Sequence, residues 1–352
     1  MSAMNCVFLL FLAVSYIDPF VTESIEGPQL LTVEGMVTSG VGPHVIKLSR
    51  SANYRSIFEA LIRPVSGARM IVRDDLGNVT FFAENTVDRG SCNSPSNFSA
   101  QVGRSYALLF RLLDGKAYSS FPETLQAVPE LDDLSYQVVT IPVEGETNLR
   151  SGIQLIGSFS DPLNQNNFYF WRNDSSVYIL KTRPDLFTIR PPEADDRDPD
   201  PKDCRNTYFK TELVGNEGIF FAQDDNFNGL NTNVPIGFVE DDGLWFIQTF
   251  RIDVKQLIIT QIAYRFLMLV KQQNEINGSV FDPPPANIRG NVVSLDNPEE
   301  TILGYFMAAG EREKRIYING QDMNFRQLVA IVPEDCREIA GSTISPPIDW
   351  NL

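Results

Sequence analysis

The stretch Ala68-Arg69-Met70-Ile71-Val72-Arg73-Asp74-Asp75-Leu76-Gly77-Asn78-Val79-Thr80-Phe81-Phe82-Ala83 decides the fold class of this 352-residue chain. Its two ends, 68–74 and 79–83, are short runs rich in β-branched and aromatic residues, which predicts two strands. The four residues between them, 75–78, predict a hairpin turn, because Gly and Asn tolerate positive φ. We therefore expect a mainly β protein.

Similar runs at 30–37, 44–49, 105–113 and 116–120 predict further strands. Several short strands at spacings of about ten residues are typical of a β-sandwich, so we expect a sandwich domain over residues 28–128. Residues 129–134 contain Pro129 and the pair Asp132-Asp133, which predicts a linker to a second domain.

The second domain is expected to be β-rich and to cover residues 135–352. Strands are predicted there at 135–143, 152–158, 167–171, 176–181, 207–214, 235–239, 244–252, 301–306 and 315–318. One long amphipathic helix is predicted over 254–277, with Asp253 as N-cap and Gly278 as stop. Its apolar face comprises Ile259, Ile262, Ala263, Phe266, Leu269 and Val270. We expect that face to pack on the sheet, and a partner-binding helix is the alternative.

The helix is followed by a proline-rich segment. Three consecutive prolines make residues 281–286 a stiff, extended strap that is neither helix nor central strand.

The charge balance excludes some partners. The chain has 45 Asp and Glu against 29 Lys and Arg, a net charge of −16. This argues against nucleic acid, whose phosphates need basic partners, and against electrostatic docking on an anionic lipid surface. The charge is expected to serve solubility, with recognition of a cationic partner as the alternative.

The N-terminal residues 1–15 are expected to be a signal peptide. Their apolar core, Val7–Val14, is too short to span a bilayer, and Ala13 and Ser15 fit cleavage after small residues. No Lys or Arg precedes the core, so a membrane anchor is the alternative. The protein is therefore expected to be exported.

Three cysteines follow Cys6 of the expected signal, and an odd number in an exported chain leaves one thiol unpaired. Cys204 and Cys336 each lie in polar, loop-like sequence, so we expect a disulfide between these two and a free Cys92. The chain has no CxxC motif and no Cys/His cluster, which argues against a zinc site.

Two polar motifs have candidate functions. The single histidine, His44, ends the turn 40–44 and is accompanied by no GxSxG elbow, so we expect a turn residue rather than a catalytic base. Residues 224–229 match the opening of a calcium loop, with oxygen-bearing Asp224, Asn226 and Asn228 at alternate positions. The closing Glu is replaced by Pro235, so an acidic loop without calcium is the favoured interpretation.

Aromatic residues alternate with polar ones in 166–172. Tyr169 and Trp171 are candidates for an exposed platform that stacks on a ligand, although packing of alternate rings in a strand core is favoured. The acidic, proline-broken run 195–203 is expected to be a solvated loop, with a cation site or a docking strap as alternatives. No spacing singles out a glycosidase-like carboxylate pair.

Several motifs together resemble a family of outer-membrane lipoproteins from Bacteroidota known as domain of unknown function 4249. The resemblance covers nearly the whole chain and is carried by Val45–Ser49, Asp114–Lys116, Asp161-Pro162, Tyr169–Arg172, Lys271–Asn274, Gly278–Ala286, Gly290-Asn291, Asn297-Pro298, Leu303–Phe306 and Lys314–Ile316. In addition, Pro64–Ala68 and Gly103–Tyr106 look like the immunoglobulin-like modules of exported Bacteroidota proteins, which implies that topology for residues 28–128.

The chain departs from the family at the lipid anchor. Family members typically present a lipobox that ends in Cys before a sequence like Ile-Asp-Pro-Phe, whereas here Tyr16 precedes Ile17-Asp18-Pro19-Phe20. Thioether acylation is impossible at a tyrosine. Either the protein is released soluble, or position 16 has been altered from a lipoprotein.

The resemblance implies a protein of the outer membrane or cell surface. It implies a β-barrel TonB-dependent transporter as partner and carries over no catalytic residues. We therefore expect a non-enzymatic accessory or ligand-capture protein. A structural or adhesive surface protein is the alternative, and a hydrolase that uses a carboxylate pair is the third.

Overall fold

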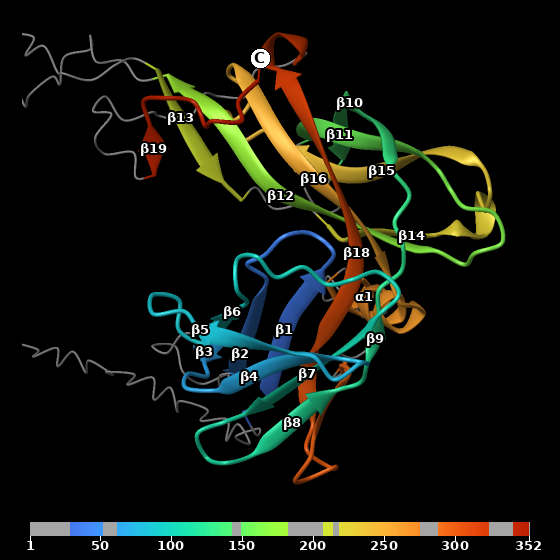
Figure 1. The fold of residues 1–352 in the computed structure, drawn as a ribbon. Coiled ribbons are helices and arrows are strands. Elements are labelled where there is room, and N and C mark those ends of the chain that lie inside the picture. Colours follow the sequence, from blue (N-terminus) through green and yellow to red (C-terminus); the bar gives the residue numbers. More distant parts are fainter. Residues whose placement is uncertain are drawn as a thin grey trace, which may run out of the picture.

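The computed structural model describes residues 29–51, 62–142, 149–181, 207–213, 218–274, 288–323 and 341–351. These residues form a mainly β structure with one α-helix, as the sequence predicts (Figure 1). Within the same ranges, no helix has the length and apolar character needed to cross a bilayer.

The N-terminal strands follow the predicted order. They are β1 (Leu31–Thr38), β2 (Val45–Ser51), β3 (Ile62–Pro64), β4 (Arg69–Asp74), β5 (Val79–Glu84), β6 (Ser91–Asn93), β7 (Ser105–Arg111), β8 (Ala117–Ser120) and β9 (Glu123–Thr124). The hairpin between β4 and β5 forms as expected. Asp74 Oδ1 accepts hydrogen bonds from the backbone N–H groups of Leu76 and Asn78, at 3.0 and 2.8 Å, and Gly77 has a φ of 87°. This local chemistry fixes the register of the hairpin.

The C-terminal part of the chain completes this N-terminal structure. Strand β17 (Val292–Ser294) pairs with β8, and β18 (Ile302–Asn319) pairs in parallel with β1, from Leu31 opposite Ile302 to Thr38 opposite Ala309. We call β1–β9, β17 and residues 302–309 the first lobe. The expected boundary, which assigned all of 135–352 to the second domain, is therefore wrong for these strands.

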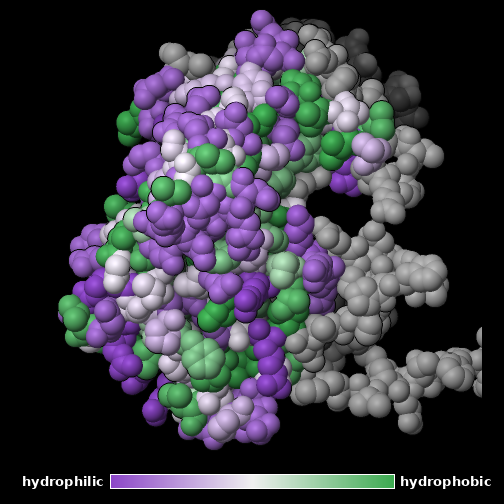
Figure 2. Space-filling view, turned by 90° about the vertical axis from the view of Figure 1, so that its right-hand side faces the viewer, coloured by the Kyte–Doolittle hydropathy of each residue, from purple (hydrophilic) through white to green (hydrophobic). Residues whose placement is uncertain are grey.

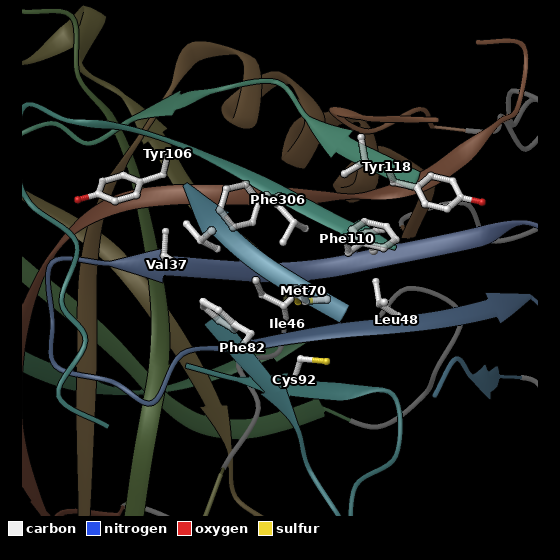
Figure 3. Close-up of a cluster of buried hydrophobic side chains, with 14 of the residues drawn as sticks. Val37, Ile46, Leu48, Met70, Phe82, Cys92, Tyr106, Phe110, Tyr118 and Phe306 are labelled. Carbon is white, nitrogen blue, oxygen red and sulfur yellow. The ribbon is translucent and has the colours of Figure 1, made fainter. Parts of the chain in front are cut away.

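The first lobe has one hydrophobic core. Its large side chains come from both ends of the chain and gather between the strands (Figure 3). Phe110 and Tyr118 stack with ring centroids 4.9 Å apart, and Phe306 of β18 packs in the same cluster. Since Phe306 is far from the other two in sequence, the core forms only when the C-terminal strand has docked.

The second lobe contains the remaining elements. They are β10 (Leu131–Pro142), β11 (Leu149–Ser160), β12 (Phe168–Lys181), β13 (Thr207–Glu212), β14 (Phe220–Gln223), η1 (Asp224–Asn226), β15 (Asn231–Glu240), β16 (Thr249–Ile259), α1 (Gln261–Asn274), η2 (Gly320–Asp322), β19 (Ser342–Thr343) and the rest of β18. A three-stranded sheet, β10-β11-β15, and the sheet containing β18-β16-β12-β13-β19 contribute to a second core. Leu131 and Leu134 are buried in that core, so the expected linker 129–134 is mostly the start of a strand.

The helix is shorter than the sequence predicts. Residues 254–259 are the end of β16, and the helix begins at Gln261. Thr260, rather than Asp253, caps it, because its hydroxyl accepts a hydrogen bond from Ala263 N at 3.2 Å. The buried helical residues are Ala263 and Leu267, whereas Ile262 and Leu269 of the predicted face are exposed. The expected stop at Gly278 and the strap 281–286 lie outside the described residues.

Candidate functional site

A buried carboxylate, Asp161, organises a polar cluster of the second lobe. It follows β11, and its side chain accepts three hydrogen bonds, from Tyr169 OH at 2.5 Å, Asn167 Nδ2 at 3.1 Å and Gly229 N at 3.1 Å. Asp161 is 5% exposed. The three donors come from different loops and strands, so this carboxylate holds the turn after β11, the start of β12 and the loop before β15 together.

Tyr169 and Trp171 lie on the core side of β12. Their relative exposures are 0% and 1%, and their rings stack with centroids 5.6 Å apart. The indole N–H of Trp171 donates to Gln256 Oε1 at 2.9 Å, and burial raises the pKa of the Tyr169 phenol. The favoured interpretation, core packing of the strand, is what the structure has, and the alternative of an exposed stacking platform does not fit these two buried rings.

Asp224 lies next to this cluster and is also buried. Its Oδ2 accepts hydrogen bonds from Asn167 N at 2.8 Å and from Asn228 Nδ2 at 3.3 Å. Burial raises the pKa of Asp224, and the nearby charge of Asp161 raises it further. The two carboxylates are connected through Asn167, so the structure brings Asp224, Asn228 and Tyr169 together around Asp161.

The loop 224–229 does not fit a calcium site. Asn228 uses its amide within the chain, since Oδ1 accepts from Asn164 N at 3.0 Å and Nδ2 donates to Gln165 O at 2.7 Å. Asn226 is exposed, and η1 replaces the open loop that would direct alternate oxygens to one ion. Among the described residues, no group of three or more His, Cys, Asp or Glu side chains is arranged for a metal.

A third buried carboxylate, Glu123, lies between the first lobe and the helix. Tyr305 OH donates to Oε1 at 2.5 Å, Thr260 Oγ1 donates to Oε2 at 2.5 Å, and Asn291 Nδ2 donates to Oε1 at 3.3 Å. Burial raises the pKa of Glu123. This cluster joins four segments: Glu123 belongs to β9, Thr260 caps α1, Asn291 precedes β17, and Tyr305 belongs to β18.

Two arginines form an ion-pair network on the second lobe. Arg251 and Arg315 both contact Asp253, at 3.1 and 2.6 Å, and both contact Asp349, at 2.9 and 2.6 Å. The hydrogen bond from Arg251, together with that from Arg315, lowers the pKa of Asp349. Trp350 packs edge-on against Phe209 and Tyr317. These contacts anchor the C-terminal residues to β16 and β18.

His44 and Cys92 are buried in the first lobe. His44 follows a cis Gly42-Pro43 bond, packs edge-on against Phe98 and has a pKa lowered by burial. Cys92 is a free thiol, as expected, and burial raises its pKa to about 11. A thiol with such a pKa is not an activated nucleophile.

Several other predictions concern residues outside the described ranges. They are the signal peptide 1–15, Tyr16, the acidic run 195–203, and Cys204 with Cys336, so the disulfide stays a prediction. Asp161 and Glu123 carry no local sequence signal that predicts a buried acceptor. Asp161-Pro162 contributes to the family resemblance, but the residues around either carboxylate do not indicate burial.

One of three comparisons with known proteins identifies a family. A search of curated proteins and a search of solved structures found no match. The family model described as domain of unknown function, DUF4249, matches residues 17–315. That match includes most of both lobes and the Asp161, Asp224 and Glu123 clusters. The chain therefore belongs to the DUF4249 family.

Proposed function

We propose that the protein is a non-enzymatic accessory subunit of the outer membrane that assists a TonB-dependent β-barrel transporter in capturing a ligand. The resemblance described above implies this location and this partner. The chemistry of the described residues supports a binding role over a catalytic one.

The observation that carries the proposal is the use made of buried carboxylates. Five carboxylates are buried in the described part of the chain, and each accepts a hydrogen bond from, or forms an ion pair with, another group of the same chain. They are Glu123, Asp161, Asp224, Asp241 and Asp253. A hydrolytic carboxylate pair must face its substrate. Asp161 and Asp224 are 5% and 1% exposed and act as structural acceptors, which favours a binding scaffold over a hydrolase.

Chemical cross-linking with mass spectrometry on intact outer membranes of the source organism tests the proposal. Lys47 and Lys116 report on the first lobe, and Lys210 and Lys271 report on the second. Cross-links from either pair to extracellular or periplasmic loops of one β-barrel, absent when that barrel is deleted, are the expected result. An abundant unrelated barrel protein in the same membranes is the control for random proximity.

The contrary result is also informative. Recovery of the protein without barrel cross-links, in the medium or the periplasm, would overturn the transporter role and favour a released binding protein. Cross-links to surface polymers or to many unrelated proteins would favour the structural or adhesive alternative.

A further inference from the structure

One face of the first lobe has apolar and basic side chains. A sheet face that contacts only solvent would instead have polar side chains with charges of both signs. The strands β5, β4, β7, β8 and β17 are hydrogen-bonded side by side in that order. Successive residues of a strand point to opposite faces of its sheet. Met70, Phe82, Leu108 and Phe110 point into the core, so the residues between them point outward. We call the side formed by these outward residues the outer face.

A row of paired residues crosses the outer face. Phe81 is opposite Ile71, Ile71 is opposite Leu109, Leu109 is opposite Ser119, and Ser119 is opposite Val293. Four of these five side chains are apolar. With neighbouring strands about 4.8 Å apart, the row extends about 19 Å across the sheet. Phe81 is 73% exposed, so the row begins at an uncovered aromatic ring.

Further exposed apolar residues border the row. Val79 lies two residues from Phe81 on β5, Phe121 follows two residues after Ser119, and Leu295 follows two residues after Val293. Contiguous apolar surface of this kind is uncommon on a protein that stays alone and is typical of interaction sites. Figure 2 shows a neighbouring side of the molecule, where hydrophilic residues predominate and hydrophobic residues are scattered among them.

The charges of the outer face have one sign. Arg69, Arg73 and Arg111 are exposed outward residues, and none of them forms an ion pair in the described part of the chain. The acidic residues of these strands, Asp74 and Glu84, occupy positions of the opposite, inward parity. The face is therefore basic, although the whole chain has a net charge of −16.

Two of these arginines are placed unfavourably for a free surface. Arg69 is directly opposite Arg111 on the adjacent strand. Like charges at directly opposed positions of a sheet destabilise it. A carboxylate from another molecule, placed between them, would relieve the repulsion and form charge-assisted hydrogen bonds.

We propose that the outer face is a docking surface for another protein, whose contact region has apolar side chains bordered by Asp or Glu. A protein surface fits better than a membrane for two reasons. Ile71 and Leu109 lie between neighbours in the row, and these two and the terminal Val293 are only partly exposed. Membrane binding, in contrast, needs side chains that reach about 5–10 Å into the interface. In addition, the net charge of −16 opposes approach to anionic lipid. The proposal does not require the partner to be a transporter.

Site-specific photo-crosslinking in cells of the source organism tests the proposal. A photoreactive phenylalanine analogue replaces Phe81 on the outer face, or the exposed Leu163 of the second lobe as control. The expected result is one discrete protein adduct from position 81 and not from position 163. The cross-linked partner peptide, identified by mass spectrometry, should contain apolar residues next to Asp or Glu.

Charge reversal separates docking from folding. Arg111→Glu places opposite charges at the Arg69 pair, so its melting temperature should equal or exceed that of the parent, while the adduct from position 81 falls at least tenfold. Arg265→Glu on α1 makes the same change in net charge at an exposed position and should leave the adduct unchanged.

Each other outcome overturns the proposal. A lipid adduct would assign the face to the membrane, and an adduct between two copies of this chain would assign it to self-association. No adduct, equal adducts from both positions, or an adduct that survives Arg111→Glu would show that the face has no such partner. An adduct with an acidic, apolar protein surface that is not part of a β-barrel is the expected result in another form and supports this inference, while the transporter role is decided separately by the cross-linking of intact membranes.

Discussion

Replacement of Asp161 by Asn tests whether the buried carboxylate cluster is structural. The two oxygens of Asp161 serve different donors, since Tyr169 OH and Asn167 Nδ2 donate to Oδ1 while Gly229 N donates to Oδ2. An Asn side chain has one acceptor oxygen and one amide group. In either orientation of the amide, at least one former donor faces another donor.

The expected loss of stability follows from those contacts. A hydrogen bond to a charged group contributes about 1.5–3 kcal/mol, and a buried donor left without an acceptor costs about 1–3 kcal/mol. These contributions overlap, so we expect Asp161→Asn to lower the free energy of unfolding by about 2–4 kcal/mol. Tyr169→Phe removes one donor and should cost less, about 1–2 kcal/mol.

Urea unfolding followed by tryptophan fluorescence measures this loss. All three tryptophans of the chain, Trp171, Trp245 and Trp350, belong to the second lobe, so the signal follows the lobe that contains the cluster. The midpoint should fall while the dependence on urea stays the same. Asp225→Asn is the matched control, because Asp225 is exposed and should change stability by less than about 0.5 kcal/mol.

Two results would refute the reasoning. One is a stability of Asp161→Asn within about 0.5 kcal/mol of the parent, and the other is an equal loss in Asp225→Asn. The double variant with Tyr169→Phe adds a further check, because two residues that share a hydrogen bond should give losses that do not add. Strict additivity would mean that the 2.5 Å contact contributes nothing.

Three other predictions concern the first lobe and its junction. Burial raises the pKa of Glu123 in the folded protein above its ordinary value of 4.5. The protonated carboxyl therefore stabilises the fold below pH 4.5, and this stabilisation is lost as pH rises through the folded-state pKa. Glu123→Gln should therefore reduce the fall in stability with rising pH, and an unchanged pH profile in urea titrations would contradict this. Gly304→Ala should cost more than about 3 kcal/mol, since a Cβ there would lie 2.0 Å from Val33 O at a φ of 81°. The control Gly77→Ala has positive φ but no atom within 4 Å and should cost about 1–2 kcal/mol. Cys92, with its pKa raised to about 11, should resist alkylation in the folded protein and react after unfolding, which mass spectrometry of alkylated peptides measures.

The sequence was sufficient where local chemistry decides the structure. The hairpin at 74–79 depends on a carboxylate that accepts from the turn and on a glycine with positive φ, and both are encoded within six residues. The mainly β class and the order of the N-terminal strands follow from similar short-range signals, whereas the free Cys92 follows from the odd number of cysteines after Cys6. Family membership was also accessible, because it depends on the identity of residues along the chain.

Only the tertiary structure decided two kinds of feature. One is the type of an element that is buried on both faces, and the other is the contact between segments far apart in the sequence. The sequence places 254–259 in a helix because an apolar helical period begins at Ile259 and Asp253 is a possible N-cap. In the structure, however, this segment is a central strand with one face in the core of the second lobe and the other in the cluster that contains α1. A strand buried on both faces loses the alternation that would reveal it. The parallel pairing of β1 with β18 joins residues about 270 positions apart, a contact that local propensity does not encode. The burial of Glu123 requires Tyr305 of the same β18, and that of Asp161 requires Gly229 from a distant loop. The opposed arginines of the outer face likewise arise only from the register of β4 on β7.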